Sequence, residues 1–352
     1  MSDSTIFLRV RQIIPEGEDT KTFLFERTDG KRLVYKAGQF LTFLIPQHGH
    51  EVRRSYSMSS APDADDFPAI TVKRIPNGEI SRFWVHTVQV GDVLAALPPA
   101  GRFVLEKPDE NPHDLILLGA GSGITPLFSI MKQALISKKE NNITLIYASR
   151  NTKSTLFRDR IQELQQTFPE RLNVIQIHSQ PSDDWTGIRG RINNTRLEQL
   201  VSKSLRFQPE HARFFICGPY ELMRSMEITL HFMGFTSAQI RKESFVIPSV
   251  PMPQTVSFPH TIALHFRNQD YTLLVPAHTT ILDAALDAGI NLPYSCKGGR
   301  CSACAGICRS GTVRMSVNEV LTNRDLEEGW ILTCSGYVDS EDVKIEVLSG
   351  YN

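Results

Sequence analysis

The chain has 352 residues, of which 41% are hydrophobic and 22% are charged, as is typical of a folded globular protein. At about 150 residues per domain, this length predicts two or three domains. The 38 basic and 38 acidic side chains cancel, so we expect neither the basic surface of a nucleic-acid-binding protein nor an acidic docking tail. The sequence predicts no secretory signal and no transmembrane segment of about 20 apolar residues, and we expect a cytoplasmic protein.

The first hundred residues are rich in strand-like segments. Apolar and polar residues alternate in the first predicted strands, and an apolar run from Gln39 to Ile45 ends at Pro46. One helix is predicted, near residues 81–88. Several strands with glycine and proline between them predict an antiparallel β-barrel for residues 5–105.

From Asp114 onwards, buried strands alternate with amphipathic helices. The first strand is followed by a glycine-rich turn, a helix and a second strand, which together form a βαβ unit. Repetition of this pattern predicts a parallel sheet with its ligand site at the carboxyl ends of the strands. Strands are predicted at 115–118, 143–148, 172–177 and 213–217, and helices over 127–135, 157–168 and 197–201 and in the segment that ends near Gly234.

Four prolines fall between Pro248 and Pro259, and they favour an extended, semi-rigid linker. Beyond it the sequence predicts a hairpin from residues 261–267 and 271–275, then a helix at 281–288 that Gly289 ends. We therefore expect a multidomain α+β and α/β protein with a barrel domain at 1–110, a parallel-sheet domain at 111–247, the linker at 248–259 and a C-terminal domain at 260–352.

Four cysteines of the C-terminal domain have the spacing C-x4-C-x2-C followed by 29 residues and a last cysteine: Cys296, Cys301, Cys304 and Cys334. This spacing is typical of plant-type iron–sulfur ligation. Small residues fill the loop, so its backbone N–H groups can turn toward a negatively charged cluster. A structural zinc site is the alternative, although zinc ribbons usually present two separated C-x2-C pairs. Cys308 lies outside the pattern, and we interpret it as a buried cysteine without a ligand role.

Two segments of the barrel domain are suited to a flavin nucleotide. In Arg54–Ser57 the arginine can pair with a pyrophosphate, the tyrosine ring can face an isoalloxazine, and a serine can bond a ring nitrogen. The turn Asn77–Ser81 opens the predicted helix, whose N-terminus can receive a phosphate. Taken alone, the first segment is explained equally well by an exposed hairpin with a surface arginine. Two phosphate-suited segments in one barrel domain together favour a flavin.

A glycine-rich turn joins the first strand of the parallel-sheet domain to its helix. The small residues Gly121, Ser122 and Gly123 let a pyrophosphate approach the helix N-terminus. Ile124 or Pro126, depending on register, replaces the third glycine of a G-x-G-x-x-G motif. The turn therefore departs from the generic dinucleotide-binding pattern while keeping the strand–turn–helix arrangement.

The second strand of this domain ends at Ser149 and Arg150, and Arg158 follows. An enzyme specific for NAD usually places an acidic residue here for the ribose hydroxyls. Two arginines and a hydroxyl suit a 2′-phosphate instead, so we expect NADPH, with NADH as the alternative. Arg158 and Asp159 can also be explained as a solvated helix face.

Three motifs, in chain order, resemble the ferredoxin–NADP reductase superfamily: Arg54-x-Tyr56-Ser57, Gly121-x-Gly123-x-x-Pro126 and Cys217-Gly218-Pro219. The loop CKGGRCSAC resembles that of plant-type [2Fe–2S] ferredoxins, which implies a β-grasp fold for the last domain. With both parts in one chain, the sequence resembles the reductase components of bacterial oxygenases, especially those of the phenylacetyl-CoA epoxidase and the ketosteroid 9α-hydroxylase.

The resemblance implies a hydride-transfer centre of Ser57, Cys217 and Glu243, although a core thiol is the alternative explanation for Cys217. Glu243 and Phe245, in a turn that closes the second domain, would cover the flavin. FAD would be held by Arg54, Tyr56, Ser57, Lys73, Gly78 and Ser81. The nicotinamide nucleotide would be held by Gly121, Ser122, Gly123, Thr125, Ser149, Arg150, Arg158, Cys217 and Pro219. One iron would be held by Cys296 and Cys301, and the other by Cys304 and Cys334.

These inferences predict an NAD(P)H-dependent electron-transfer flavoprotein. A hydride passes from nicotinamide to FAD, and electrons leave singly through a [2Fe–2S] cluster to a redox partner protein. The resemblance implies an oxygenase partner in aromatic, phenylacetyl-CoA or related catabolism. The alternatives are a fatty-acid desaturase or a hybrid-cluster protein as acceptor and, more remotely, a non-catalytic binding module stabilised by zinc.

Overall fold

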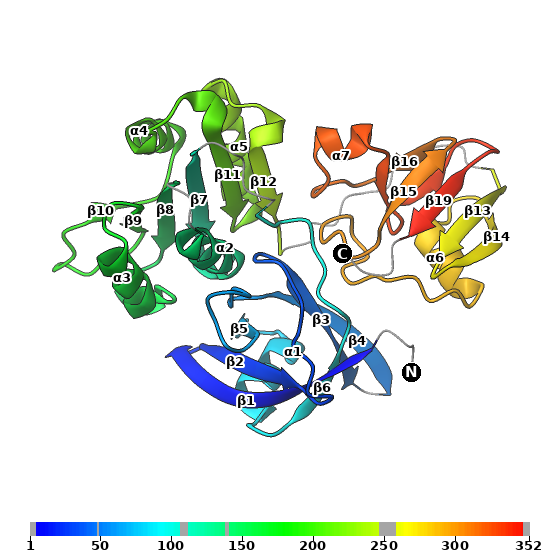
Figure 1. Cartoon of the computed structure of the whole chain (residues 1–352), viewed down its shortest axis with the longest axis horizontal. Helices are drawn as coiled ribbons and strands as arrows, with labels where there is room; N and C mark the ends of the chain where they lie inside the picture. The colour runs from blue at the N-terminus through cyan, green and yellow to red at the C-terminus, as the bar shows by residue number, and fades with distance from the viewer. Residues whose placement is uncertain (1–4, 48, 106–111, 138–140, 246–257, 348–352) are drawn as a thin grey trace.

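The computed structural model describes residues 5–47, 49–105, 112–137, 141–245 and 258–347. They form three bodies, which are a barrel, a parallel sheet covered by helices and a smaller C-terminal sheet (Figure 1). Most of the predicted linker lies outside these ranges, and only Phe258 and Pro259 of it are described. Within these ranges, no helix is long and apolar enough to cross a membrane.

The first body is an antiparallel sheet of six strands in the order β4-β3-β6-β1-β2-β5. A bridge between Met58, just past β4, and Ile70 of β5 joins the two edges, so the sheet closes into the predicted barrel. The buried Trp84 ring packs edge-on against Phe23 and Phe43 in its core. The strands are β1 (Ile6–Gly17), β2 (Thr20–Arg27), β3 (Phe40–Gln47), β4 (His50–Ser57), β5 (Ala69–Lys73) and β6 (Val93–Ala96).

Two details of the barrel differ from the prediction. β3 does not end at Pro46 but continues through it to Gln47. Proline has no backbone N–H to donate to a neighbouring strand. In the described part of the chain, β6 pairs with β3 only at Phe43 and Leu44, so no strand lies beside Pro46 on the β6 side of β3 and the proline is tolerated. The helix also begins earlier than predicted, as α1 (Glu79–Arg82), and continues as a π-helical turn (Phe83–Thr87).

The second body has six parallel strands in the order β10-β9-β8-β7-β11-β12. The predicted strands are confirmed as β7 (Asp114–Ala120), β8 (Asn142–Ser149), β9 (Leu172–His178) and β11 (Ala212–Cys217), and the predicted helices as α2 (Ile124–Ile136), α3 (Arg158–Thr167), α4 (Asn194–Ser204) and α5 (Tyr220–Phe232). Two edge strands were not predicted from the sequence, β10 (Ile188–Arg189) and β12 (Ile240–Glu243).

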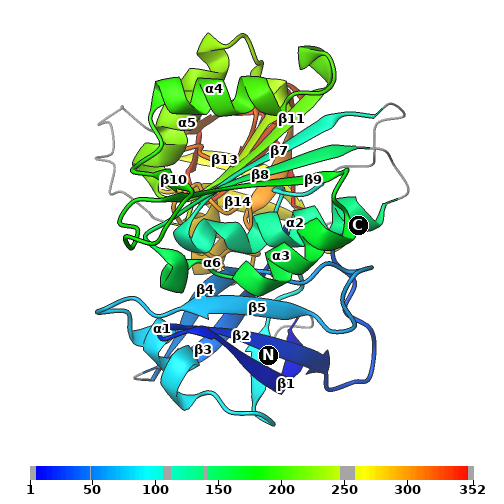
Figure 2. The same ribbon diagram turned by 90° about the vertical axis from the view of Figure 1, so that its left-hand side faces the viewer.

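Helices cover both faces of the parallel sheet. α2 and α3 lie between the sheet and the barrel (Figure 2), in a core that also includes Ala37 and Phe103. α4 and α5 cover the opposite face. The Ser129 hydroxyl of α2 donates a hydrogen bond to the Ser60 carbonyl oxygen at 2.5 Å and accepts one from the Gly38 N–H at 3.3 Å. These contacts fix the barrel against α2, which covers one face of the sheet.

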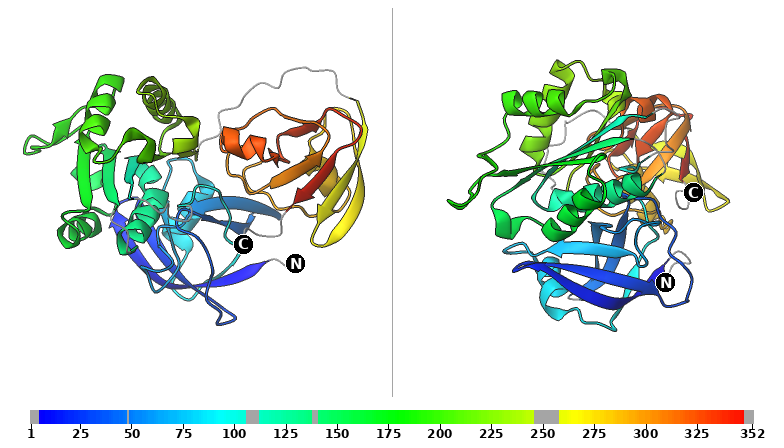
Figure 3. Two further views of the ribbon diagram at one scale, coloured as in Figure 1. Left: turned by 45° about the horizontal axis from the view of Figure 1, so that its top comes forward. Right: turned by 60° about the vertical axis from the view of Figure 1, so that its left-hand side comes forward.

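The third body is a mixed sheet in the order β14-β13-β19-β15-β17, with the pair β16-β18 beside it. It lies beside both other bodies (Figure 3). The predicted hairpin and helix are confirmed, and α6 packs on the sheet in the predicted β-grasp arrangement. The elements are β13 (His260–Phe266), β14 (Gln269–Val275), α6 (Ile281–Asp287), β15 (Ala305–Ser310), β16 (Val313–Met315), α7 (Asn323–Glu327), β17 (Trp330–Leu332), β18 (Gly336–Val338) and β19 (Lys344–Val347).

Candidate functional site

Three strand ends from two bodies meet at one point. β4 of the barrel ends at Ser57, β11 ends at Cys217 and β12 ends at Glu243. Cys217 and Glu243 are register partners, and the Ser57 hydroxyl donates a hydrogen bond to Oε2 of Glu243 at 2.8 Å. The fold therefore brings together the three residues predicted for hydride transfer. Glu243 lies at the end of a strand and not in the expected turn.

Burial controls protonation in this centre. It raises the pKa of Glu243 to about 7, and the hydrogen bond from Ser57 lowers that pKa in part. Burial, together with the charge of Glu243, raises the pKa of the Cys217 thiol well above its usual value. At neutral pH Cys217 is therefore a neutral thiol and a poor nucleophile, whereas Glu243 can take up or release a proton beside Ser57.

The glycine-rich turn packs against the end of the Cys217 strand. A Cβ atom on Gly123 would lie 2.2 Å from the Cys217 carbonyl oxygen, so no larger residue fits. Gly121 has a φ of 56°, in the left-handed region that favours glycine. The Thr125 hydroxyl donates to the Ser122 carbonyl oxygen at 2.8 Å and so closes the first turn of α2. These small residues bring the start of α2 close to the predicted hydride-transfer centre.

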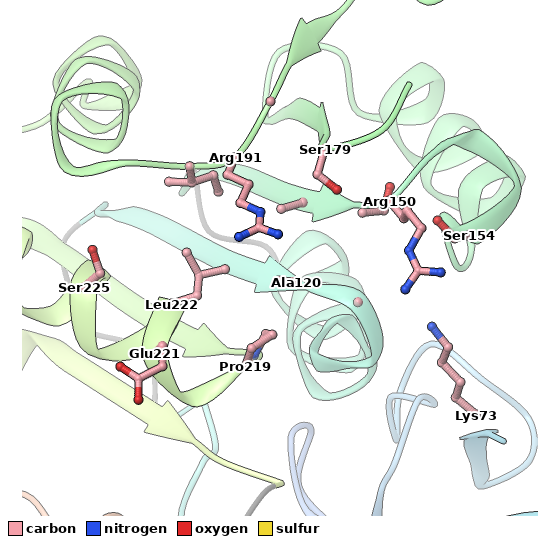
Figure 4. A pocket seen from close by; sticks show the side chains of 15 residues that line it. Lys73, Ala120, Arg150, Ser154, Ser179, Arg191, Pro219, Glu221, Leu222 and Ser225 are labelled. Atoms are coloured by element: carbon pink, nitrogen blue, oxygen red, sulfur yellow. The ribbon is translucent and has the colours of Figure 1, made fainter. Parts of the chain in front are cut away.

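A cavity of about 560 Å³ opens beside this turn (Figure 4). Its lining includes four residues predicted to bind the nucleotide: Gly121, Ser149, Arg150 and Pro219. Two further cations line it, Lys73 at the end of β5 and Arg191 after β10. In Figure 4 the side chain of Lys73 extends from the barrel toward Arg150 on the parallel sheet. The lining thus carries three cations and one acidic residue, Glu221, which makes the cavity a net basic site at the carboxyl ends of parallel strands, where a dinucleotide phosphate is expected.

Arg158 lies outside the cavity lining and donates a hydrogen bond to its neighbour Asp159 at 2.8 Å. Ser149 does line the cavity, and its hydroxyl is hydrogen-bonded to that of Thr155 at 2.7 Å. Arg191 was not predicted from the sequence, because the two-residue strand before it gives no apolar pattern. One sequence signal was available. Arg191 follows the third predicted strand, and ligand-binding residues of parallel sheets gather after the carboxyl ends of successive strands.

The residues predicted to hold FAD lie along β4, β5 and the start of α1. Tyr56 packs edge-on against Trp84, with ring centroids 5.6 Å apart, and Arg54 is exposed. The Ser81 hydroxyl donates to the Gly78 carbonyl oxygen at 3.0 Å, so it also closes the turn before α1. The Lys73 side chain also lines the cavity, and its predicted role in holding FAD stays a prediction.

Phe245 follows the buried Glu243 by two residues and is 45% exposed. A ring in this position can pack on a flat ligand at the junction of the two bodies. Its role in covering a flavin stays a prediction.

The four predicted cluster cysteines converge in one loop region. Cys304 and Cys334 are buried, and Cys296 and Cys301 are partly buried. Contacts with Cys301 and Cys334 lower the pKa of the Cys296 thiol, and a contact with Cys334 lowers the pKa of the Cys304 thiol. These contacts place Cys296 beside Cys301 and Cys334, and Cys304 beside Cys334, so thiols from both ends of the motif lie next to one another, as ligation by all four cysteines needs.

Backbone donors surround these sulfur atoms. The Gly298 N–H donates to Sγ of Cys296 and the Gly299 N–H to Sγ of Cys334, both at 3.3 Å. Gly299 has a φ of 72°, and a Cβ atom there would lie 2.4 Å from the Val317 carbonyl oxygen. The loop therefore fits a negatively charged cluster whose sulfur atoms accept N–H bonds.

Cys308 lies apart from the ligand set, in β15. Its thiol donates to the Ser310 carbonyl oxygen at 3.1 Å. It is half-buried, not fully buried as predicted, because it lies near the end of the strand.

Comparison with known proteins agrees with this geometry. Residues 8–105 match the oxidoreductase FAD-binding domain, residues 117–227 the oxidoreductase NAD-binding domain, and residues 264–339 the 2Fe-2S iron-sulfur cluster binding domain. The ferredoxin reductase component of 3-ketosteroid-9-alpha-monooxygenase from Mycobacterium tuberculosis is 34% identical over 98% of this chain and 96% of its own length. The chain belongs to the family of oxygenase reductase components.

A further relative is a 1,2-phenylacetyl-CoA epoxidase component from Escherichia coli, which is 30% identical over 96% of both chains. The solved structure of phthalate dioxygenase reductase has the same fold, with a TM-score of 0.60 and 23% identity over 98% of each chain. The chain is therefore an oxidoreductase with FAD-, NAD- and [2Fe–2S]-binding domains, and the predictions of its fold class, cofactors and electron-transfer chemistry are confirmed. The match also favours the iron–sulfur cluster over zinc.

Proposed function

We propose that this reductase takes a hydride from NADPH and delivers electrons singly to a partner oxygenase in the cytoplasm. FAD accepts the hydride and the [2Fe–2S] cluster carries single electrons onward when both are bound. The named relatives serve a ketosteroid monooxygenase and a phenylacetyl-CoA epoxidase. They support an oxygenase that acts on an aromatic acyl-CoA or a related hydrophobic substrate as the acceptor.

One observation carries the proposal, and it lies on strand β4. Ser57 bonds Glu243 at the predicted hydride-transfer centre, and Ser55, two residues earlier, bonds Ser295 at 2.5 Å, next to the cluster ligand Cys296. Residues two apart lie on one face of a strand. The same face of β4 therefore links the centre where a flavin receives the hydride to the loop that holds the cluster, which supports the order nicotinamide, flavin, cluster.

Individual roles follow from this arrangement. Ser57 and Glu243 would orient the flavin ring and hold a proton beside it, while Cys217 would provide a neutral, apolar surface for the nicotinamide. Cys296 and Cys301 would hold one iron, and Cys304 and Cys334 the other. We place the domain boundaries at 1–110, 111–247, 248–259 and 260–352. The last boundary is supported by a separate hydrophobic core that contains only residues beyond 260, whereas Ala37 and Phe103 of the first domain share a core with the second.

The choice of NADPH rests on the basic cavity. Lys73, Arg150 and Arg191 line it, and the end of β8 carries no acidic residue to bind ribose hydroxyls. A 2′-phosphate accepts charge-assisted hydrogen bonds from such cations. Arg158 lies outside the cavity lining, so we assign the 2′-phosphate to Arg150, Arg191 and Lys73.

The proposal is tested with the holoprotein in two stages. Anaerobic mixing with NADPH should bleach the flavin first and the cluster afterwards. The reduced protein should then support product formation by the terminal oxygenase of a phenylacetyl-CoA epoxidase or a 3-ketosteroid monooxygenase, with product measured per NADPH oxidised. Product formation at the full rate by the Cys301→Ser variant, which lacks a cluster ligand, would contradict the proposed route.

A further inference from the structure

The C-terminal body contacts the other two at separate places. Its cluster loop touches β4, where Ser295 bonds Ser55 and the Tyr294 ring lies 4.1 Å from the Arg53 guanidinium carbon. At a second place, α7 contacts residues 237–239 of the parallel-sheet body. Figures 1 and 3 both show α7 on the side of its domain that faces this body.

Asp325 of α7 is buried between two arginines from different bodies. It pairs with Arg102, in the segment that leaves the barrel, and with Arg241 of β12 at 3.4 Å. The Asp325 side chain is 3% exposed, and those of Arg102 and Arg241 are 18% and 15% exposed. One carboxylate of the cluster domain is thus shared, away from water, by a cation from each of the other two bodies.

Further contacts fix this group in place. The Arg102 guanidinium lies 4.0 Å from the centroid of the Trp330 ring, and Arg241 donates to the Thr322 hydroxyl at 3.2 Å. Burial alone would raise the pKa of Asp325, but hydrogen bonds from Thr322 and the charge of Arg102 lower it. Asp325 is therefore ionised at neutral pH, and its contacts with both arginines are charge-assisted.

We propose that Asp325, Arg102 and Arg241 form an ionic latch in which Asp325 is a positioning residue for flavin-to-cluster electron transfer. The cluster loop on β4 and the latch on α7 are two separate attachments, and two attachments fix the orientation of a tethered domain where one does not. Arg241 also precedes Glu243 by two residues on β12. The latch therefore ties the cluster domain to the strand that forms the hydride-transfer centre.

Docking through the latch can be reversed because its charged groups have partners both when the domain is docked and when it is not. When the domain is docked they pair with one another, and when it leaves they regain water. Loss of one arginine leaves Asp325 incompletely paired only in the docked state, so the undocked state is favoured. The coupling energy of a close charge pair across an interface changes the docking equilibrium constant by about tenfold or more.

The test compares Arg102→Gln and Arg241→Gln with wild type in the full-length holoprotein. Both residues lie outside the cluster domain, so the cluster spectrum serves as a check of folding. Arg309→Gln is the matched control, because Arg309 pairs with Glu346 at 2.7 Å within the C-terminal body, and its loss removes the same charge away from the latch. Anaerobic stopped-flow spectroscopy follows flavin reduction by NADPH and cluster reduction as separate steps.

Both latch variants should reduce the flavin at the wild-type rate and the cluster about tenfold more slowly. Asp325→Asn, which keeps an acceptor for the Thr322 bonds, should do the same, and combining it with Arg241→Gln should add little because the residues act together.

The latch is overturned if cluster reduction is unchanged in both arginine variants, if the Arg309→Gln control slows it equally, or if flavin reduction is lost as well. The inference rests on the proposed order of electron transfer, and the two can fail separately. If the wild-type flavin never reduces the cluster, the proposed function fails. If wild type reduces it and the latch variants match that rate, only the latch fails.

Discussion

Removal of the Glu243 carboxylate should change how the stability of this reductase depends on pH. Burial raises the pKa of Glu243 from 4.5 to about 7. Between these values the folded protein keeps the proton while the unfolded chain has lost it. Stability from this group is therefore fully present below pH 4.5 and is lost as the pH rises through about 7.

The size of the effect follows from the width of this pH range. At about 1.4 kcal/mol per pH unit, a range of roughly 2.5 units corresponds to about 3 kcal/mol of unfolding free energy. Glu243 is 6% exposed, so solvent screens this cost only weakly. The free-energy difference between Glu243→Gln and wild type should be constant below pH 4.5, shift by about 3 kcal/mol in favour of the variant toward pH 7, and be constant again above it.

Urea unfolding of the holoprotein at several pH values, followed by flavin fluorescence, measures this difference. Glu198→Gln is the control, because Glu198 is exposed on α4. Ser57→Ala should extend the loss of stability to higher pH, because the Ser57 hydrogen bond lowers the pKa of Glu243. If the curves of wild type and Glu243→Gln stay parallel from pH 4 to 8, Glu243 is not a buried carboxyl with a raised pKa.

Two further predictions concern the cluster and the nucleotide. Cys301→Ser and Cys304→Ser should each remove the visible absorbance of the cluster while hydride transfer to FAD stays near the wild-type rate, and an unchanged spectrum in both would refute the ligand assignment. Arg150→Ala should lower kcat/KM for NADPH by about 10- to 150-fold, from the loss of about 1.5 to 3 kcal/mol, with NADH nearly unaffected. Arg158→Ala, which changes an arginine paired with Asp159 outside the cavity, is its control, and equal losses for both nucleotides in Arg150→Ala would reject the preference for NADPH.

Features encoded by local spacing were predictable from the sequence. The proposed cluster ligands Cys296, Cys301 and Cys304 lie within one loop, and the βαβ pattern needs only buried strands and amphipathic helices. The loop glycine at 299 was also readable, because a tight loop around a cluster needs small residues.

Features that depend on distant partners were not predictable in the same way. β12 is a four-residue edge strand with two buried and two half-buried residues, so it has no apolar run and forms only beside β11. Arg191 lines the cavity only because β10 pairs with β9, and a two-residue strand leaves no apolar pattern in the sequence. The pairing of Asp325 with Arg102 joins residues 223 positions apart, and no sequence pattern indicates it.

The last prediction concerns the independence of the reductase and cluster parts. The buried core of the C-terminal body contains only residues from 262 to 347, and the other three cores contain only residues from 8 to 240. The contacts between them at Ser55, Asp325 and Arg241 are polar. Because no shared apolar core is cut, a fragment of residues 1–247 should fold, bind FAD and reduce ferricyanide with NADPH at nearly the full rate.

The same fragment should fail to reduce cytochrome c or the partner oxygenase, because it lacks the cluster that releases electrons singly. Adding residues 254–352 as a separate piece should restore only part of this transfer, since the tether holds the cluster domain at an effective concentration in roughly the millimolar range. The matched comparison is the full chain at the same flavin concentration. If the fragment alone supports the partner as well as the full chain does, the flavin delivers electrons directly and the cluster is not their exit.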